Sequence, residues 1–139
     1  MYSKGVMEFE EMKRKILIVD DDENNNISFK IGFENKYSDY EIITAESGNK
    51  CLKLLEENEI PDVILLDIMM PEMSGWELYD RIKGNPAWKD IPIIFLTART
   101  DSLAKDAGTF LGEDYIEKPY EIDDVKNRIE TILRKKTHV

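Results

Sequence analysis

Apolar residues along this chain gather in short runs, separated by longer stretches in which they recur every three or four positions. Runs of four to six residues bounded by proline, glycine or acidic residues are typical of strands buried on both faces. Five strands are expected, at 15–19, 40–45, 63–67, 93–97 and 114–117. The run at 63–67 is the clearest, because Val63 to Leu66 are all apolar and Asp67 ends it.

The stretches between the strands predict helices, because apolar residues three or four positions apart lie on one helical face. Helices are expected at 24–35, from a cap at Ser47 to 58, from a cap at Ser74 to 84, from 101 or 102 to 111, and at 122–135. In the first helix, the expected apolar face begins with Ile27 and Ile31, and Glu34 or Phe33 continues it one turn later. Its three leading asparagines are poor helix formers and good caps, which leaves its start open.

Strands and helices alternate five times, which predicts an α/β fold with a parallel sheet covered by helices on both faces. A doubly wound five-stranded sheet of this (βα)5, flavodoxin-like kind commonly has the strand order 2-1-3-4-5. The 139 residues are expected to form one domain at 15–136, between an N-terminal extension at 1–14 and a short tail at 137–139.

Composition and charge narrow the classes of function. Apolar residues make up 42% of the chain and charged residues 35%, as in soluble globular proteins. The formal net charge of −10 argues against nucleic-acid binding and favours cations or a protein partner with a basic surface. No apolar run is long enough for a membrane span or a signal-peptide core, so we expect no membrane association and a cytoplasmic location. The single cysteine, Cys51, is expected to pack in the core.

Polar side chains stand at the carboxyl ends of four predicted strands: Asp20 and Asp21, Asp67, Thr97, and Lys118. The carboxyl ends of parallel strands meet at one edge of the sheet, where α/β proteins bind ligands. Taken singly, each residue has a plainer interpretation: the acids as a solvated turn or helix cap, Thr97 as an ordinary strand end, Lys118 as a surface lysine. Together they converge on one crevice, which four separate strand ends would rarely do without a function.

The carboxylates of such a crevice repel one another, and two of them ~4 Å apart cost about 4 kcal/mol at an effective dielectric near 20. Lys118 offsets part of this repulsion, and a hard divalent cation would offset the rest. Mg²⁺ prefers oxygen ligands and is usually held by one or two carboxylates together with a phosphate. An acid, a hydroxyl, an ammonium group and Mg²⁺ suit phosphoryl transfer, with Asp67 as the nucleophile.

Four segments, ILIVDDDE, VILLDIMMPEMSGWEL, IPIIFLTA and DYIEKPY, resemble a receiver domain of the two-component response regulators, of the chemotaxis-regulator-like kind. The resemblance spans about residues 13–133. It implies that Asp67 is the phosphoacceptor for a histidine kinase or a phosphotransfer protein. It also implies that Asp20 and Asp21 are the acidic pair, with Asp21 the more direct Mg²⁺ ligand, and that the backbone carbonyl of Met69 joins the metal shell.

The same resemblance assigns a switch. Thr97 and Lys118 are expected to contact the phosphoryl group, and Tyr115 matches the family's switch aromatic. The Lys118–Pro119 bond resembles the family's cis peptide, which would aim the lysine inward. Movement of Thr97 toward the phosphoryl group would vacate space that Tyr115 fills, changing the surface of helix 4, strand 5 and helix 5 for a downstream protein target.

Two further positions tune the phosphorylated state in this family. Met69 and Arg99 stand two residues after Asp67 and Thr97, where side chains influence the attacking water. A bulky methionine and a long arginine would shield the acyl phosphate. Slow autodephosphorylation is therefore expected.

Other functions stay open at this point. A Mg²⁺-dependent phosphohydrolase of the haloacid-dehalogenase type needs a second acid two residues after its nucleophile, where this chain has Met69. A nucleotide-binding fold needs a glycine-rich loop after strand one, where this chain has DDDENNN. We expect a signalling phosphoacceptor rather than an enzyme. Its alternatives are a phosphorelay intermediate and a receiver excised from a larger regulator or hybrid kinase, and a phosphorylation-dependent homodimer stays open.

Overall fold

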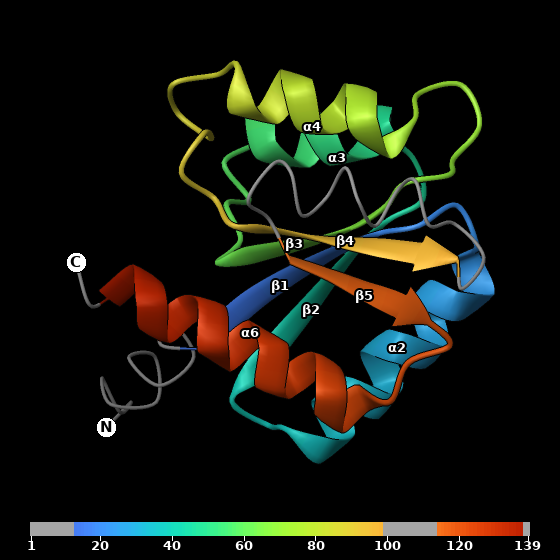
Figure 1. Cartoon of the computed structure of the whole chain (residues 1–139), viewed down its shortest axis with the longest axis vertical. Helices are drawn as coiled ribbons and strands as arrows, with labels where there is room; N and C mark the ends of the chain where they lie inside the picture. Colours follow the sequence, from blue (N-terminus) through green and yellow to red (C-terminus); the bar gives the residue numbers. More distant parts are fainter. Residues whose placement is uncertain (1–12, 99–113, 138–139) are drawn as a thin grey trace, which may run out of the picture.

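The structure is a computed structural model that describes residues 13–98 and 114–137. In these residues strands and helices alternate as the sequence predicts (Figure 1). The elements are β1 Arg14–Val19, α2 Glu23–Lys36, β2 Tyr40–Ala45, α3 Gly48–Glu56, β3 Val63–Asp67, α4 Gly75–Lys83, β4 Ile93–Ala98, β5 Asp114–Lys118 and α6 Ile122–Thr137. The helix expected from residue 101 or 102 to residue 111 lies outside the described residues.

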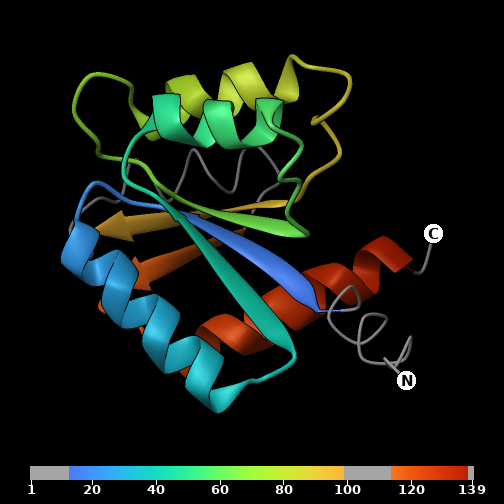
Figure 2. The ribbon, with the colours of Figure 1, turned by 180° about the vertical axis from the view of Figure 1, so that it is seen from behind.

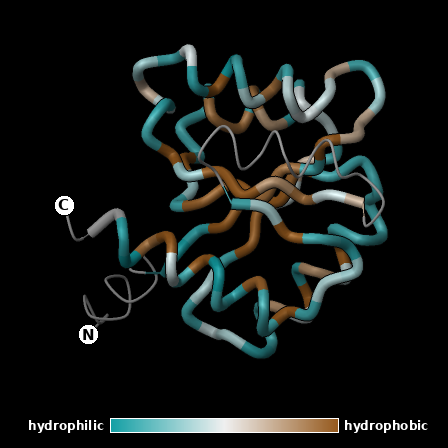
Figure 3. The backbone as a smooth tube through the Cα atoms, in the orientation of Figure 1, coloured by the Kyte–Doolittle hydropathy of each residue, from teal (hydrophilic) through white to brown (hydrophobic). Residues whose placement is uncertain are grey.

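The five strands form one parallel sheet in the order β2-β1-β3-β4-β5, which confirms the predicted order. Helices α3 and α4 cover one face, and α2 and α6 cover the other (Figures 1 and 2). Alternate residues of β1 serve the two faces: Leu17 and Val19 pack in the core under α3 and α4, and Ile16 and Ile18 in the core under α2 and α6. Burial on both sides explains why the central strands are apolar throughout, as the brown centre of Figure 3 shows.

The predicted apolar face of α2 is wrong for Ile27 and Ile31, and only its alternative member Phe33 is buried. Ile27 and Ile31 are 55% and 56% exposed, whereas Phe29 and Phe33 are buried against the sheet. Both pairs are spaced four residues apart, but they lie on opposite sides of the helix, so only one pair can face the sheet. The aromatic pair does so because it buries more area and joins a ring cluster, with Phe33 and Tyr40 centroids 5.2 Å apart in an edge-to-face arrangement.

Side-chain caps fix where the helices begin. Ser47 accepts a hydrogen bond from the Lys50 backbone at 3.1 Å and so caps α3, as predicted. Ser74 caps α4 in the same way. The cap of α2 is Asp22, so the acidic run after β1 serves partly as a helix cap, which was the plainer interpretation of these residues.

Strand β2 lies at one edge of the sheet, and two side chains of α2 bond to its backbone. The Ile42 N–H donates to Glu34 Oε2 at 2.8 Å, and the Ile42 carbonyl accepts from Lys30 Nζ at 2.6 Å. Lys30 and Glu34 are themselves paired at 2.9 Å. The two side chains thus occupy both backbone groups of Ile42.

Among the helices of residues 13–98 and 114–137, none combines the length and the apolar character that crossing a membrane requires.

Candidate functional site

Three carboxylates meet where β1 and β3 end. In the register of these strands Val19 lies beside Leu66, so the residues that follow, Asp20 and Asp67, are neighbours. Asp21 comes next in the chain, and one carboxylate oxygen from each of the three acids lies within 4.8 Å of the others. The structure therefore brings these predicted residues together, at a spacing that suits a cation with oxygen ligands.

Lys118 reaches this cluster from the end of β5. Its Nζ lies 2.8 Å from Asp20 Oδ2 and 3.3 Å from Asp67 Oδ2. The Lys118–Pro119 peptide is cis, as expected. Burial lowers the pKa of Lys118, but the hydrogen bond to Asp20 and the charges of Asp67 and Asp20 outweigh it, so the pKa is raised overall. The ammonium group is therefore charged at neutral pH and bridges two acids.

Asp20 is almost completely buried, with 1% of its surface exposed. Its Oδ1 accepts from the Asp22 backbone N–H at 3.0 Å, and its Oδ2 accepts from Lys118 and from Asn25 Nδ2 at 3.0 Å. Asp21 is exposed, and its carboxylate accepts no hydrogen bond from the described residues. The two adjacent acids thus differ: Asp20 is held by donors, and Asp21 is open to a ligand.

Asp67 is 7% exposed, and its Oδ1 accepts from the Met69 backbone N–H at 3.2 Å. Burial has the largest effect on the pKa of Asp67 and raises it. The charge of Lys118 lowers this pKa, the charge of Asp20 raises it, and the net result is a pKa of about 6. The carboxylate form still dominates at neutral pH. The Met69 side chain is 70% exposed beside it, while Arg99 lies outside the described residues.

Thr97 is the last but one residue of β4 and directly follows Leu96, which pairs with Asp67. It is 1% exposed, and its Oγ1 has no hydrogen-bond partner among the described residues. A buried hydroxyl without a partner is costly, so a group that accepts or donates there would satisfy it. Thr97 also shares a sheet face with Tyr115, because Tyr115 pairs with Phe95 and residues two apart in a strand point the same way.

Two contributors to the site escaped the sequence analysis. The amide of Asn25 bonds Asp20 and also the hydroxyl of Tyr120, 95 residues away, at 3.2 Å. The second is Gly75, the first residue of α4. Its N–H donates to the Ile68 carbonyl at 2.8 Å, and a Cβ at this position would lie 2.4 Å from the Asp67 carbonyl oxygen. Only glycine lets α4 approach the loop that carries the acid this closely.

A model of the response regulator receiver domain family matches residues 16–130. The chain belongs to this family. The chain is 39% identical over 131 residues to a probable cyclic di-GMP phosphodiesterase of Vibrio cholerae. The match covers 94% of this chain and 29% of that protein. It is 37% identical over 125 residues to the alkaline phosphatase synthesis transcriptional regulatory protein PhoP of Bacillus subtilis, covering 89% of this chain and 50% of that one.

A solved structure agrees with this assignment. The receiver domain of a Francisella response regulator superposes with a TM-score of 0.75 at 32% identity, covering 90% of this chain and 99% of that one. The chain spans half or less of the two full-length relatives above, and their names describe different activities. The receiver domain is therefore what is shared.

Proposed function

We propose that this receiver domain accepts a phosphoryl group on Asp67 from the phosphohistidine of a histidine kinase or a phosphotransfer protein. The observation that supports this most strongly is the convergence on one carboxylate. Asp67 is contacted by Lys118 and the Met69 N–H, and two further acids lie within reach. A nucleophile, a fixed cation and a set of oxygen ligands at one sheet edge are the components of phosphoryl transfer.

In the reaction, an oxygen of the Asp67 carboxylate forms a bond to phosphorus while the phosphorus–nitrogen bond of the phosphohistidine breaks. The electron pair of that bond stays with the imidazole, which takes up a proton from solvent. The ionised acid is the nucleophile, and the pKa of about 6 for Asp67 keeps this form dominant at neutral pH. Lys118 would neutralise the transferred oxygens, and the unpaired hydroxyl of Thr97 would donate to one of them.

Mg²⁺ is the proposed cofactor. The residues fit it, because among residues 13–98 and 114–137 three carboxylates face a single ammonium group, leaving uncompensated negative charge. Asp21 would be the more direct ligand, since Asp20 already accepts three hydrogen bonds; Asp67 and the Met69 carbonyl would complete the protein's share. When bound, Mg²⁺ supplies positive charge that balances the acids and the phosphoryl oxygens.

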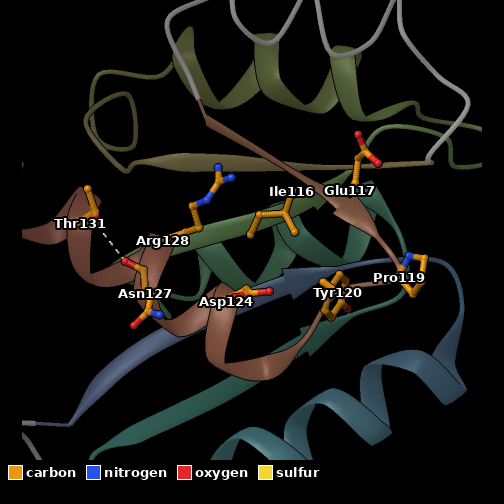
Figure 4. A pocket seen from close by; sticks show the side chains of 8 residues that line it. All are labelled: Ile116, Glu117, Pro119, Tyr120, Asp124, Asn127, Arg128 and Thr131. Atoms are coloured by element: carbon orange, nitrogen blue, oxygen red, sulfur yellow. Dashed lines mark hydrogen bonds between the residues drawn. The ribbon is translucent and has the colours of Figure 1, made fainter.

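The proposed output is a change in the surface that β5 and α6 share with the helix expected before β5. Thr97 and Tyr115 face the same side of the sheet, so movement of the threonine toward a phosphoryl group would open space next to the tyrosine. A groove already exists on this surface (Figure 4). It is lined by Ile116, Glu117, Pro119, Tyr120, Asp124, Asn127, Arg128 and Thr131.

We propose a downstream protein as the partner that reads this surface, in the cytoplasm where a histidine kinase makes phosphohistidine from ATP. Nucleic acid and membrane are not proposed as ligands, given the net charge of −10. A homodimer formed on phosphorylation and a relay to a second histidine are the competing outputs.

Intact mass spectrometry tests the acceptor. The protein would be incubated with Mg²⁺ and either acetyl phosphate or phosphoramidate, whose phosphorus–nitrogen bond resembles that of phosphohistidine. We expect one phosphoryl adduct that disappears in EDTA and in the Asp67→Asn variant. No adduct from either donor, or an adduct that persists in the variant, would overturn the proposal.

A further inference from the structure

Asn25, in the first turn of α2, connects the phosphoacceptor pocket to the loop after β5. One hydrogen of its side-chain amide goes to Asp20 Oδ2 at 3.0 Å and the other to the Tyr120 hydroxyl oxygen at 3.2 Å. Its backbone N–H is fixed by the Asp22 cap at 3.1 Å. The orientation of the amide is determined chemically, because an ionised carboxylate only accepts hydrogen bonds, so the nitrogen must face Asp20.

The need for this contact follows from the burial of Asp20. A carboxylate that is 1% exposed cannot be solvated by water, so its charge depends on protein donors. Lys118 provides one of them, but it is shared: Nζ is 2.8 Å from Asp20 and 3.3 Å from Asp67. If Lys118 turns toward a phosphoryl group on Asp67, its bond to Asp20 weakens. Asn25 and the Asp22 N–H are then the remaining donors of the described residues to Asp20.

We propose that Asn25 is a positioning residue, which holds Asp20 in place while Lys118 transfers its contact to the phosphoryl group. This inference rests on the proposed function of Asp67. The Asn25 side chain bonds Asp20 and Tyr120 rather than the nucleophile, so it acts through Asp20 and Lys118. The rate of phosphoryl transfer therefore depends on Asn25 even when the cation site is saturated.

Tyr120 anchors the other side of the amide. It stands two residues after Lys118 and packs edge-on against Phe29 of α2, with ring centroids 5.9 Å apart. Tyr120 also lines the groove of Figure 4. Two hydrogen bonds through Asn25 thus connect Asp20 to a residue that lines the groove. This connection does not involve Thr97 or Tyr115.

The test compares Asn25→Ala with Asn24→Ala. Asn24 is the exposed neighbour on the same turn, so the same substitution there reproduces the change in helix propensity without touching Asp20. Phosphorylation by acetyl phosphate would be followed at saturating Mg²⁺ over a range of donor concentrations, and Mg²⁺ affinity would be measured separately by calorimetry. For Asn25→Ala we expect a maximal rate about tenfold lower, as for the loss of a hydrogen bond to a charged group. The half-saturating donor concentration and the Mg²⁺ dissociation constant should stay within about twofold.

A milder variant keeps the test decisive if Asn25→Ala folds poorly. Tyr120→Phe removes only the second acceptor of the amide, so it should lower the maximal rate less than Asn25→Ala does. It should also shift the Asn25 side-chain NH₂ resonances in ¹H–¹⁵N spectra, which a purely structural role of Tyr120 in packing would leave in place. Unchanged resonances in Tyr120→Phe would contradict the bridge.

The outcomes separate this inference from the proposed function. A wild-type protein that is not modified at Asp67 refutes the proposed function before any Asn25 variant is compared. If wild type is modified at Asp67 and Asn25→Ala reacts as fast as Asn24→Ala, the positioning role is refuted and the phosphoacceptor role stands. A rate loss matched by an equal loss of Mg²⁺ affinity also refutes it, because Asn25 would then act on the cation site alone.

Discussion

Asp67→Asn is expected to make the metal-free protein more stable at neutral pH, although it removes the nucleophile. The pKa of Asp67 is raised from 3.8 to about 6, with burial as the main cause, so the folded protein holds the acid's proton more tightly than the unfolded chain does. The ionised carboxylate therefore destabilises the fold. This destabilisation is absent below pH 3.8 and fully present above about pH 6. Asparagine is neutral and similar in shape, so the variant does not suffer it.

The size of the effect follows from the shift. A difference of about two pKa units, at 1.36 kcal/mol for each, corresponds to roughly 3 kcal/mol in the free energy of unfolding. Urea denaturation of both proteins in EDTA, from pH 4 to pH 8, would measure it. The stability advantage of the variant should grow across the window between pH 4 and pH 6 and then level off. Asp90→Asn, an exposed residue of the α4–β4 loop, is the matched control and should change stability by less than about 0.5 kcal/mol.

Adding Mg²⁺ should reverse the order. At a thousand times its dissociation constant a ligand that binds only the folded state adds about 4.1 kcal/mol, which exceeds the advantage of the variant. This gain should appear in the wild type and be largely lost in Asp67→Asn. The reasoning is refuted if the variant is no more stable than wild type in EDTA at pH 7.5. It is equally refuted if the difference does not depend on pH, since the ion pair with Lys118 would then balance the effect of burial on the pKa of Asp67.

Three further predictions concern the segments around the phosphoacceptor. Gly75→Ala should lower the free energy of unfolding by about 1–3 kcal/mol and slow the phosphorylation of Asp67, because the new Cβ would lie 2.4 Å from the Asp67 carbonyl oxygen. An unchanged melting temperature would contradict this. Glu72→Gly should raise the urea concentration at the denaturation midpoint by the equivalent of about 0.5–1 kcal/mol, because Glu72 has a φ of 66°, which glycine adopts without strain. A lower midpoint would show that the Glu72 side chain stabilises the loop. Met69→Ala and Arg99→Ala should lose a radiolabelled phosphoryl group faster than wild type, and slower decay would show that these side chains do not shield it.

The fold and most of the site were predictable because each piece of evidence is local in the sequence. Asp67 and Thr97 directly end or follow apolar runs, Lys118 precedes a proline at the end of the last strand, and parallel strands bring such ends together without further information. The α2 face was not predictable in this way. Ile27 and Phe29 begin two stripes of the same spacing, and only the ring partners on neighbouring elements decide which one is buried.

The role of Asn25 was hidden for a related reason. Its two side-chain partners are Asp20, which lies five residues before it, and Tyr120, which lies on the last strand–helix connection. An asparagine in the first turn of a helix has an ordinary interpretation as a cap, and nothing local distinguishes it from Asn24. Only the folded structure, in which the connection after β5 reaches the residues that follow β1, reveals the bridge.

The pairing of Lys30 and Glu34 with the Ile42 backbone has a consequence for the behaviour of this protein at high concentration. An edge strand with open backbone groups is a template on which another chain can add a strand, and this is how ordered aggregates begin. Here a charged pair on a helix of the same chain bonds both backbone groups of Ile42, in the middle of that edge. Protection of the edge is thus tied to the folded state of α2. Conditions that loosen this helix while leaving the sheet intact are therefore expected to expose the Ile42 backbone groups to pairing with another chain.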